Sequence, residues 1–223
     1  MALLSRRVAV LPVAAALAAC TYSGGDIGDA LQRKATWLSY VAGDDIRSHC
    51  EAGSPDRFRV VYNAVWSQQL RMYDLDSLRK LLITHATRPT DSARFSVRDP
   101  LGPWQAGESR VQLDDKAYDA LVAAFAGSGM FAPPPVGLDL PSRSYFWSAA
   151  YCRGGHYGFT GWAYPSPRFA AITFDKLLFQ GDRTGVAVIP AGPVPLDPEW
   201  ESEHGQGHVT DFTVTVGRNG PLR

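Results

Sequence analysis

The sequence predicts an α+β fold, a single domain built mainly from antiparallel β-sheet with one clear helix at about residues 115–126. The 223 residues include 16 Pro, 21 Gly, ten Phe, nine Tyr and six Trp, a composition typical of short strands and structured loops. Several segments alternate apolar and polar residues with period two, whereas one long segment has the three-and-four spacing of an amphipathic helix. Basic and acidic residues balance at 22 each without a basic run, which argues against a nucleic-acid partner.

The N-terminal half is expected to contain short strands. Residues 35–42 are rich in strand-forming residues and end at the turn signal Gly43-Asp44-Asp45, although a helix that begins at Asp29 is an alternative. Apolar residues alternate with polar ones over 57–63 and again over 69–73, which predicts an antiparallel hairpin with one buried face. The next segment, residues 78–85, could be either a strand or a helix. Two short strands are expected after it, at residues 93–98 and 109–113.

The helix over 115–126 has the clearest signals. Asp114 precedes it as an N-cap, Leu113 is placed to pack on Tyr118, and Gly127-Ser128-Gly129 ends it. Its predicted buried stripe recurs at three-and-four spacing and consists of Tyr118, Leu121, Val122 and Phe125. An extended connector that ends in three prolines follows over residues 130–135.

A second hairpin is predicted over 143–164, with its turn at Gly154-Gly155. If these glycines form the whole loop, the facing pairs are Trp147 with Trp162, Tyr145 with Tyr164 and Cys152 with Tyr157. The aromatic cluster of Tyr145, Trp147, Trp162 and Tyr164 could stack against sugar rings as a ligand platform. Aromatic residues in adjoining strands more often belong to a core beneath a helix, which is the favoured interpretation. The remaining expected strands are 169–174, 185–189 and 209–216.

The first twenty residues indicate export. Two arginines precede the apolar stretch Val8 to Ala19, which has the length of a signal-peptide core and is too short to span a bilayer. The stretch ends in Leu17-Ala18-Ala19-Cys20, and this ending resembles the lipobox of bacterial lipoproteins. In that class a lipid is attached to the cysteine, and the peptide is cut just before it. A plain signal peptide and a twin-arginine signal at Ser5-Arg6-Arg7 are the alternatives.

The resemblance covers these twenty residues and implies a domain organisation. Residues 1–19 are a signal peptide, residues 20–34 are a lipidated N-terminus and flexible tether, and residues 35–223 are one globular domain. Acyl chains on Cys20 imply a membrane partner. In Gram-negative lipoproteins an Asp directly after the lipidated cysteine favours retention in the inner membrane. Thr21 occupies this position, which implies the outer membrane, with the protein facing the periplasm. The expected function is binding or assembly with an envelope protein or a glycan, without a cofactor. A cell-wall hydrolase or a carbohydrate- or lipid-binding module is the alternative.

Cysteine usage predicts a structural disulfide. With Cys20 acylated, Cys50 and Cys152 remain as a pair in an oxidising compartment, where such pairs are usually joined. The alternative makes one of them a nucleophile, because His49 adjoins Cys50 and His156 lies four residues beyond Cys152.

Two further motifs resemble chemical sites. One cluster carries metal-ligating groups, namely Glu201, Glu203, His204, His208 and Asp211. Glycines interrupt this segment and argue against a helix that would align the ligands, so a polar loop without metal is expected. Ser77-Leu78-Arg79-Lys80 matches the Ser-x-x-Lys pattern of penicillin-binding proteins, but their other elements are missing, so an exposed charged turn is expected.

Charged residues around Cys50 form a third cluster, which consists of Asp44, Asp45, Arg47, His49 and Glu51. Arg59 and Arg71 are expected on the polar face of the first hairpin. Together these residues could bind an anionic headgroup or a peptide carboxylate through forked guanidinium contacts, while a solvated face with modest ion pairs is the favoured arrangement. If this sheet face is covered instead, each buried guanidinium requires a partner.

Overall fold

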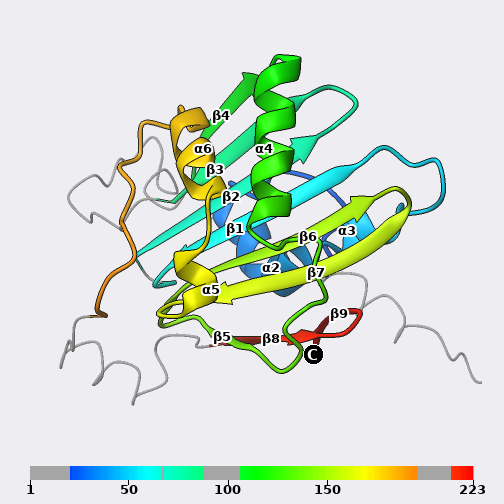
Figure 1. Cartoon of the computed structure of the whole chain (residues 1–223). Helices are drawn as coiled ribbons and strands as arrows, with labels where there is room; N and C mark the ends of the chain where they lie inside the picture. The colour runs from blue at the N-terminus through cyan, green and yellow to red at the C-terminus, as the bar shows by residue number, and fades with distance from the viewer. Residues whose placement is uncertain (1–20, 67, 88–105, 195–211, 223) are drawn as a thin grey trace, which may run out of the picture.

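The computed structural model describes residues 21–66, 68–87, 106–194 and 212–222 (Figure 1). A six-stranded antiparallel sheet with the order β4-β3-β2-β1-β6-β7 forms the centre, and a three-stranded sheet with the order β5-β8-β9 lies against it. The predicted α+β class is therefore confirmed. Among the described residues, no helix combines the length and the apolarity needed to cross a membrane.

The large sheet consists of β1 (Arg57–Ala64), β2 (Gln69–Asp76), β3 (Leu81–Ala86), β4 (Gly107–Gln112), β6 (Tyr145–Arg153) and β7 (His156–Ala163). The small sheet consists of β5 (Asp139–Pro141), β8 (Thr213–Gly217) and β9 (Gly220–Leu222). The helices are α2 (Ala30–Ala42), α3 (Asp44–Arg47), α4 (Asp115–Gly127), α5 (Pro167–Ala170) and α6 (Phe174–Gly181).

Both faces of the large sheet are covered. Helices α4 and α6 lie on one face, and α2, α3 and the small sheet lie on the other (Figure 1). Strand β1 is consequently buried along almost its whole length, and the expectation that the first hairpin has one buried face is wrong. Polar residues on the second face of β1 must therefore find partners inside the protein.

The register of β1 and β2 corrects a second expectation. Val61 pairs with Met72 and Val60 pairs with Tyr73, so odd positions of β1 share a face with even positions of β2. Arg59 therefore faces α2, whereas Arg71 faces the α6 side of the sheet, and the two arginines do not share a polar face. The sequence left this register open because both strands carry apolar residues on both faces.

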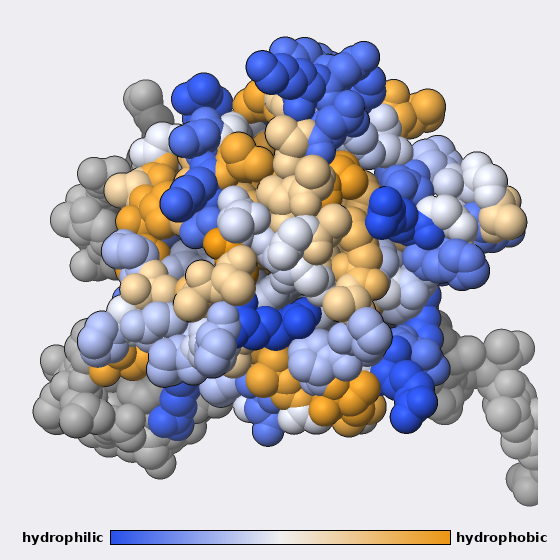
Figure 2. Space-filling model, viewed as in Figure 1, coloured by the Kyte–Doolittle hydropathy of each residue, from blue (hydrophilic) through white to orange (hydrophobic). Residues whose placement is uncertain are grey.

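Helix α4 and the second hairpin agree with the predictions. The Asp114 carboxylate accepts a hydrogen bond from the backbone N–H of Ala117 at 2.7 Å and caps α4, whose Leu121 and Phe125 pack onto the sheet. In the second hairpin, the predicted pairs Trp147 with Trp162 and Cys152 with Tyr157 are present. The exposed side of α4 carries the charged residues Asp115, Lys116 and Asp119 near its start and small residues beyond them, and Figure 2 shows hydrophilic atoms above a paler patch there.

The disulfide between Cys50 and Cys152 is also present, with Cα atoms 5.5 Å apart. It joins the segment after α3 to the end of β6, and it spans 102 positions of sequence. The prediction of a structural disulfide is confirmed, and in this form neither cysteine offers a thiolate for nucleophilic attack.

The N-terminal segment differs from the expectations. Residues 35–42 are not a strand but part of α2, whose N-cap Asp29 accepts a hydrogen bond from the Gln32 N–H at 2.8 Å, so the alternative is correct. Gly43 ends the helix with φ 64°, and a Cβ there would lie 2.5 Å from that of Ala150. The flexible tether expected over residues 20–34 is wrong for the described residues 21–34, because Tyr22 and Ile27 are buried in the core beneath the sheet.

Two expected strands in the C-terminal half are also absent. Residues 169–174 belong to α5, the following turn and the start of α6, and residues 185–189 have no regular structure. The apolar run was too short to separate strand from helix, and the buried side chains of Phe174 and Leu178 recur at helical spacing. Residues 78–85 and 109–113 overlap β3 and β4, and the expected 209–216 strand overlaps β8, which runs from Thr213 to Gly217. The expected 93–98 strand lies outside the described residues.

Candidate functional site

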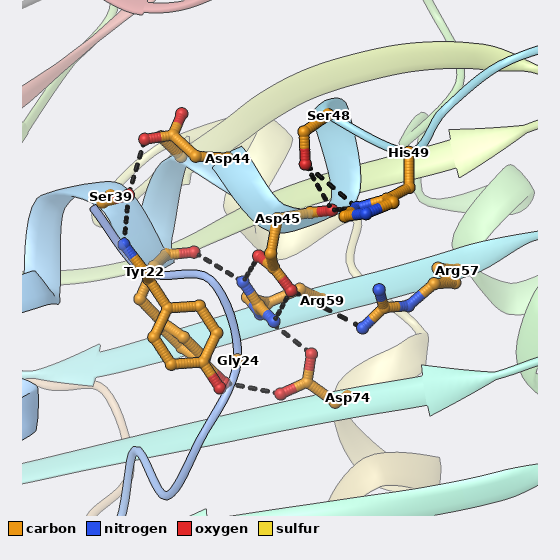
Figure 3. A network of polar contacts seen from close by, with 12 residues as sticks. Tyr22, Gly24, Ser39, Asp44, Asp45, Ser48, His49, Arg57, Arg59 and Asp74 are labelled. Atoms are coloured by element: carbon orange, nitrogen blue, oxygen red, sulfur yellow. Dashed lines mark hydrogen bonds and ion pairs between the residues drawn. The ribbon is translucent and has the colours of Figure 1, made fainter. Parts of the chain in front are cut away.

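A buried arginine organises the face of the sheet that α2 covers (Figure 3). Arg59 on β1 is 2% exposed, and its guanidinium donates from Nη1 and Nη2 to both carboxylate oxygens of Asp45 at 2.6 and 3.0 Å. Its Nε donates to Oδ1 of Asp74 on β2 at 2.8 Å, and Nη1 also donates to the Tyr40 carbonyl at 3.0 Å. The positive charge of Arg59 is therefore shared between Asp45 on α3 and Asp74 on β2. The two bonds to Asp45 have the forked geometry typical of strong Arg–carboxylate pairs.

Two tyrosine rings enclose the same guanidinium. The Arg59 Cζ lies 3.8 Å from the ring centroid of Tyr40 and 5.1 Å from that of Tyr22. The Tyr40 hydroxyl donates to Asp74 at 2.7 Å, and burial together with that carboxylate holds the pKa of Tyr40 well above its ordinary value. Burial likewise raises the pKa of Tyr22 to about 12. Both phenols are therefore neutral at physiological pH.

The Arg59 cluster is internally balanced. Burial on its own lowers the pKa of Arg59, but Asp74, Tyr40 and Asp45 outweigh it and hold the pKa well above the ordinary value. Because its hydrogen bonds go to two carboxylates and a backbone carbonyl of its own fold, Arg59 has no free pair of N–H groups with which to bind an anion. The anion-binding hypothesis is not supported for Arg59, and the favoured solvated face is wrong for it, since the sheet face is covered.

The other charged residues near Cys50 do not converge on one point. Asp44 accepts from the Ser39 hydroxyl at 2.6 Å, whereas the guanidinium of Arg47 stacks over Tyr157 at 5.1 Å. His49 is exposed, and its Nδ1 lies 2.9 Å from the Asp45 carbonyl. The three partners lie apart, on α2, on β7 and within α3, so these charged groups do not form one binding site.

Arg71 is the second fully buried arginine. It forms an ion pair with Asp182, which follows α6, and its Nε donates to Oε1 of Gln69 at 3.0 Å. A further hydrogen bond goes to the carbonyl of Val186. Arg71 therefore fastens the segment after α6 to β2, a structural role on the face opposite Arg59.

The predicted aromatic platform is part of the core. Trp147 and Trp162 are buried, and each ring packs at 5.2 Å from Phe174 of α6. The Trp162 Nε1 donates to the Ser128 carbonyl at 3.0 Å. Tyr145 is buried and Tyr164 is half-buried. The sugar-platform interpretation is therefore wrong, and the core interpretation is correct.

The two short motifs have separate outcomes. Ser77 to Lys80 form the turn between β2 and β3, where Leu78 is 77% exposed and the Lys80 ammonium contacts the Asp115 carboxylate. The expected exposed charged turn is present. The His204 and His208 cluster lies outside the described residues.

Sequence reasoning missed a cluster of Asp26, His85 and Glu108. Each offers one ligand atom of the kind that binds metal ions, and these atoms lie within 4.8 Å of one another. His85 is buried on β3, whereas Asp26 and Glu108 are exposed. Burial lowers the pKa of His85, against the opposing effect of Glu108 and Asp74, and so favours a neutral imidazole. No spacing rule brings together residues from three separate segments, and Asp26 fell in the expected tether.

Comparison with protein-family models, with curated proteins and with solved structures gives no match for this chain.

Proposed function

We propose that this chain is a lipid-anchored protein of the bacterial envelope, held at the periplasmic face of the outer membrane by acyl chains on Cys20, and that it acts by binding. One observation carries the proposal. With Cys50 and Cys152 joined, Cys20 is the cysteine that remains for acylation, and it ends the lipobox-like sequence directly before the folded body. A disulfide also fits an oxidising compartment outside the cytoplasm.

The attachment point would lie very close to the body. Tyr22 follows Cys20 by two residues, is buried, and donates its backbone N–H to the Ser39 hydroxyl at 2.8 Å. Two extended residues span roughly 7 Å. The acyl chains would therefore hold the domain against the membrane surface instead of allowing it to diffuse on a long tether.

Helix α2 would be the element nearest the bilayer, because Ser39 belongs to its last turns. Its outward stripe consists of Leu31, Lys34, Ala35 and Leu38, of which Leu31 is 67% and Leu38 is 49% exposed. Exposed leucines beside a lysine suit the boundary between headgroups and acyl chains. We expect this stripe to face the membrane.

Replacing Cys20 with alanine in the full-length protein tests the anchor. The wild type should incorporate a clickable fatty acid and fractionate with the outer membrane, whereas the variant should lose the label and leave the membrane fraction, because only acyl chains supply the hold. Cys20 is outside the disulfide, so the extracted variant should melt at the same temperature as the wild type. An unlabelled wild type, or a variant that stays with the membrane, would contradict the proposal.

The orientation is tested separately with nitroxide labels. On the acylated protein in vesicles, a label at Leu38→Cys should be shielded from a water-soluble relaxation agent, while a label at Leu78→Cys should stay accessible. Both side chains are exposed in the fold, so the comparison reports on the membrane alone. Equal accessibility with intact acylation would refute the orientation and leave the anchor standing.

The buried Trp147 and Trp162 remove the observation on which a sugar-binding module would rest. Binding through another part of the anchored body is therefore the function we propose, with an envelope protein as the partner class. Cross-linking in intact cells, with the Cys20→Ala variant as the control, tests it: a protein partner should be captured by the wild type and lost from the variant. Capture of glycan alone would contradict it.

A further inference from the structure

Three segments meet at the outer part of the sheet face that carries α2. His85 on β3 pairs directly with Glu108 on β4, and paired residues of antiparallel strands project to the same face. The N-terminal segment crosses there, since the Ala106 N–H donates to the Gly28 carbonyl at 3.1 Å. Asp26 is oriented by its own turn, because its Oδ1 accepts from the Gly28 N–H at 2.8 Å. The fold itself thus brings an imidazole and two carboxylates together.

The imidazole of His85 is buried and incompletely bonded. The residue is 7% exposed, and among the described residues its Nδ1 has no hydrogen-bond partner. A buried ring nitrogen without a partner is unusual in native proteins and calls for an explanation such as an ion. A Cβ placed on Gly28 would lie 3.1 Å from this Nδ1 and 2.8 Å from Asp26 Oδ1, so both atoms lie beside the same glycine and close to each other.

The donor set suits a divalent transition-metal ion. Neutral imidazole and carboxylate are ligands for zinc, manganese and iron, and three protein ligands leave coordination positions for water or for a partner's side chain. Ligand atoms around one zinc ion lie about 3–4 Å apart, so the present separations of up to 4.8 Å require inward movement. The exposed side chains of Asp26 and Glu108 can supply it. Arg110 contacts one Glu108 oxygen, and a carboxylate has capacity for further bonds.

We propose that Asp26, His85 and Glu108 bind a divalent transition-metal ion, and that this ion fastens the N-terminal segment to β3 and β4. The site is independent of acylation. It would hold residues 22–29 in the docked position from which α2 begins, and its open coordination positions face solvent between two exposed ligands.

Zinc titration of the chelator-treated full-length protein tests the site by calorimetry. We expect one ion per chain. Asp26→Asn and Glu108→Gln should each reduce the affinity for zinc about 10-fold or more, and His85→Ala about 100-fold or more. Loss of a group that only hydrogen-bonds to a metal ligand often costs 10–100-fold in affinity, and loss of a ligand itself should cost at least as much. At a fixed zinc concentration the melting temperature of the wild type should also rise by more than that of each variant. The exposed Asp26 and Glu108 variants keep the test decisive if His85→Ala fails to fold.

Matched controls separate this site from other histidines. His156→Ala, at the exposed turn of the second hairpin, and the double variant His204→Ala with His208→Ala should bind zinc as the wild type does. Binding that survives Asp26→Asn and Glu108→Gln but is lost in the double variant would assign the ion elsewhere and overturn the proposal. Absence of zinc binding, together with no binding of manganese or iron(II), would also overturn it.

Discussion

Replacing Arg59 with methionine is expected to lower the free energy of unfolding by about 3–5 kcal/mol. The substitution keeps most of the aliphatic stem but removes the charge that neutralises Asp45 and Asp74. Asp45 is almost fully buried, so its carboxylate would remain inside the protein without its main partner. Urea unfolding of the purified protein, followed by circular dichroism, measures the loss as a shift of the midpoint at constant slope.

Arg57 provides the matched control for that experiment. It lies 3.6 Å from the same Asp45 carboxylate, but its side chain is 42% exposed, so Arg57→Met should cost about 0–1 kcal/mol. Adding Asp45→Asn to Arg59→Met should restore part of the stability, because the penalty comes from the uncompensated charge. A loss below about 1 kcal/mol for Arg59→Met would show that the guanidinium does not stabilise this face.

Removing the disulfide with the double substitution Cys50→Ala and Cys152→Ala is expected to cost about 2–5 kcal/mol. The bridge spans 102 positions, for which the chain-entropy model gives about 4.7 kcal/mol at 25 °C. Unfolding of the double variant should coincide with that of the reduced wild type. Cys20→Ala should leave the unfolding curve unchanged, and a double variant as stable as the oxidised wild type would contradict the structural role of the bridge.

Local patterns were sufficient where one segment determines its own structure. Asp114, the three-and-four stripe of α4 and the glycine pair of the second hairpin specify caps, faces and register without help from distant residues. The cysteine pair was predictable for a different reason, since exclusion of Cys20 left a single pairing.

Segments whose state depends on distant partners were not predictable. The β-branched and aromatic residues of 35–42 favour a strand in isolation, but Trp37, Tyr40 and Val41 form a helical face that packs on the sheet. The covering of both sheet faces was not predictable either, since α4 and α6 lie far from β1 in the sequence and α2, which precedes β1, was expected to contain a strand. Arg59 is buried because this covering is present. From the sequence alone, we could predict only that a guanidinium on a covered face would need a partner.

The metal-ligating cluster shows the same limit more strongly. Asp26, His85 and Glu108 are separated by tens of residues, and only the pairing of β3 with β4 and the docking of the N-terminal segment place them together. Each residue alone is indistinguishable from an ordinary polar side chain in the sequence.

The pairing of β1 with β6 sets an order of events as the chain emerges from the ribosome. Strand β1 is complete once residue 64 has emerged, but its neighbour β6 begins at Tyr145. Until then one side of β1 presents unsatisfied amide and carbonyl groups to any other extended chain, which is a template for aggregation. Arg57 pairs with Cys152, so the arrival of β6 completes the pairing of β1 and brings Cys152 into place for the disulfide with Cys50 in one step.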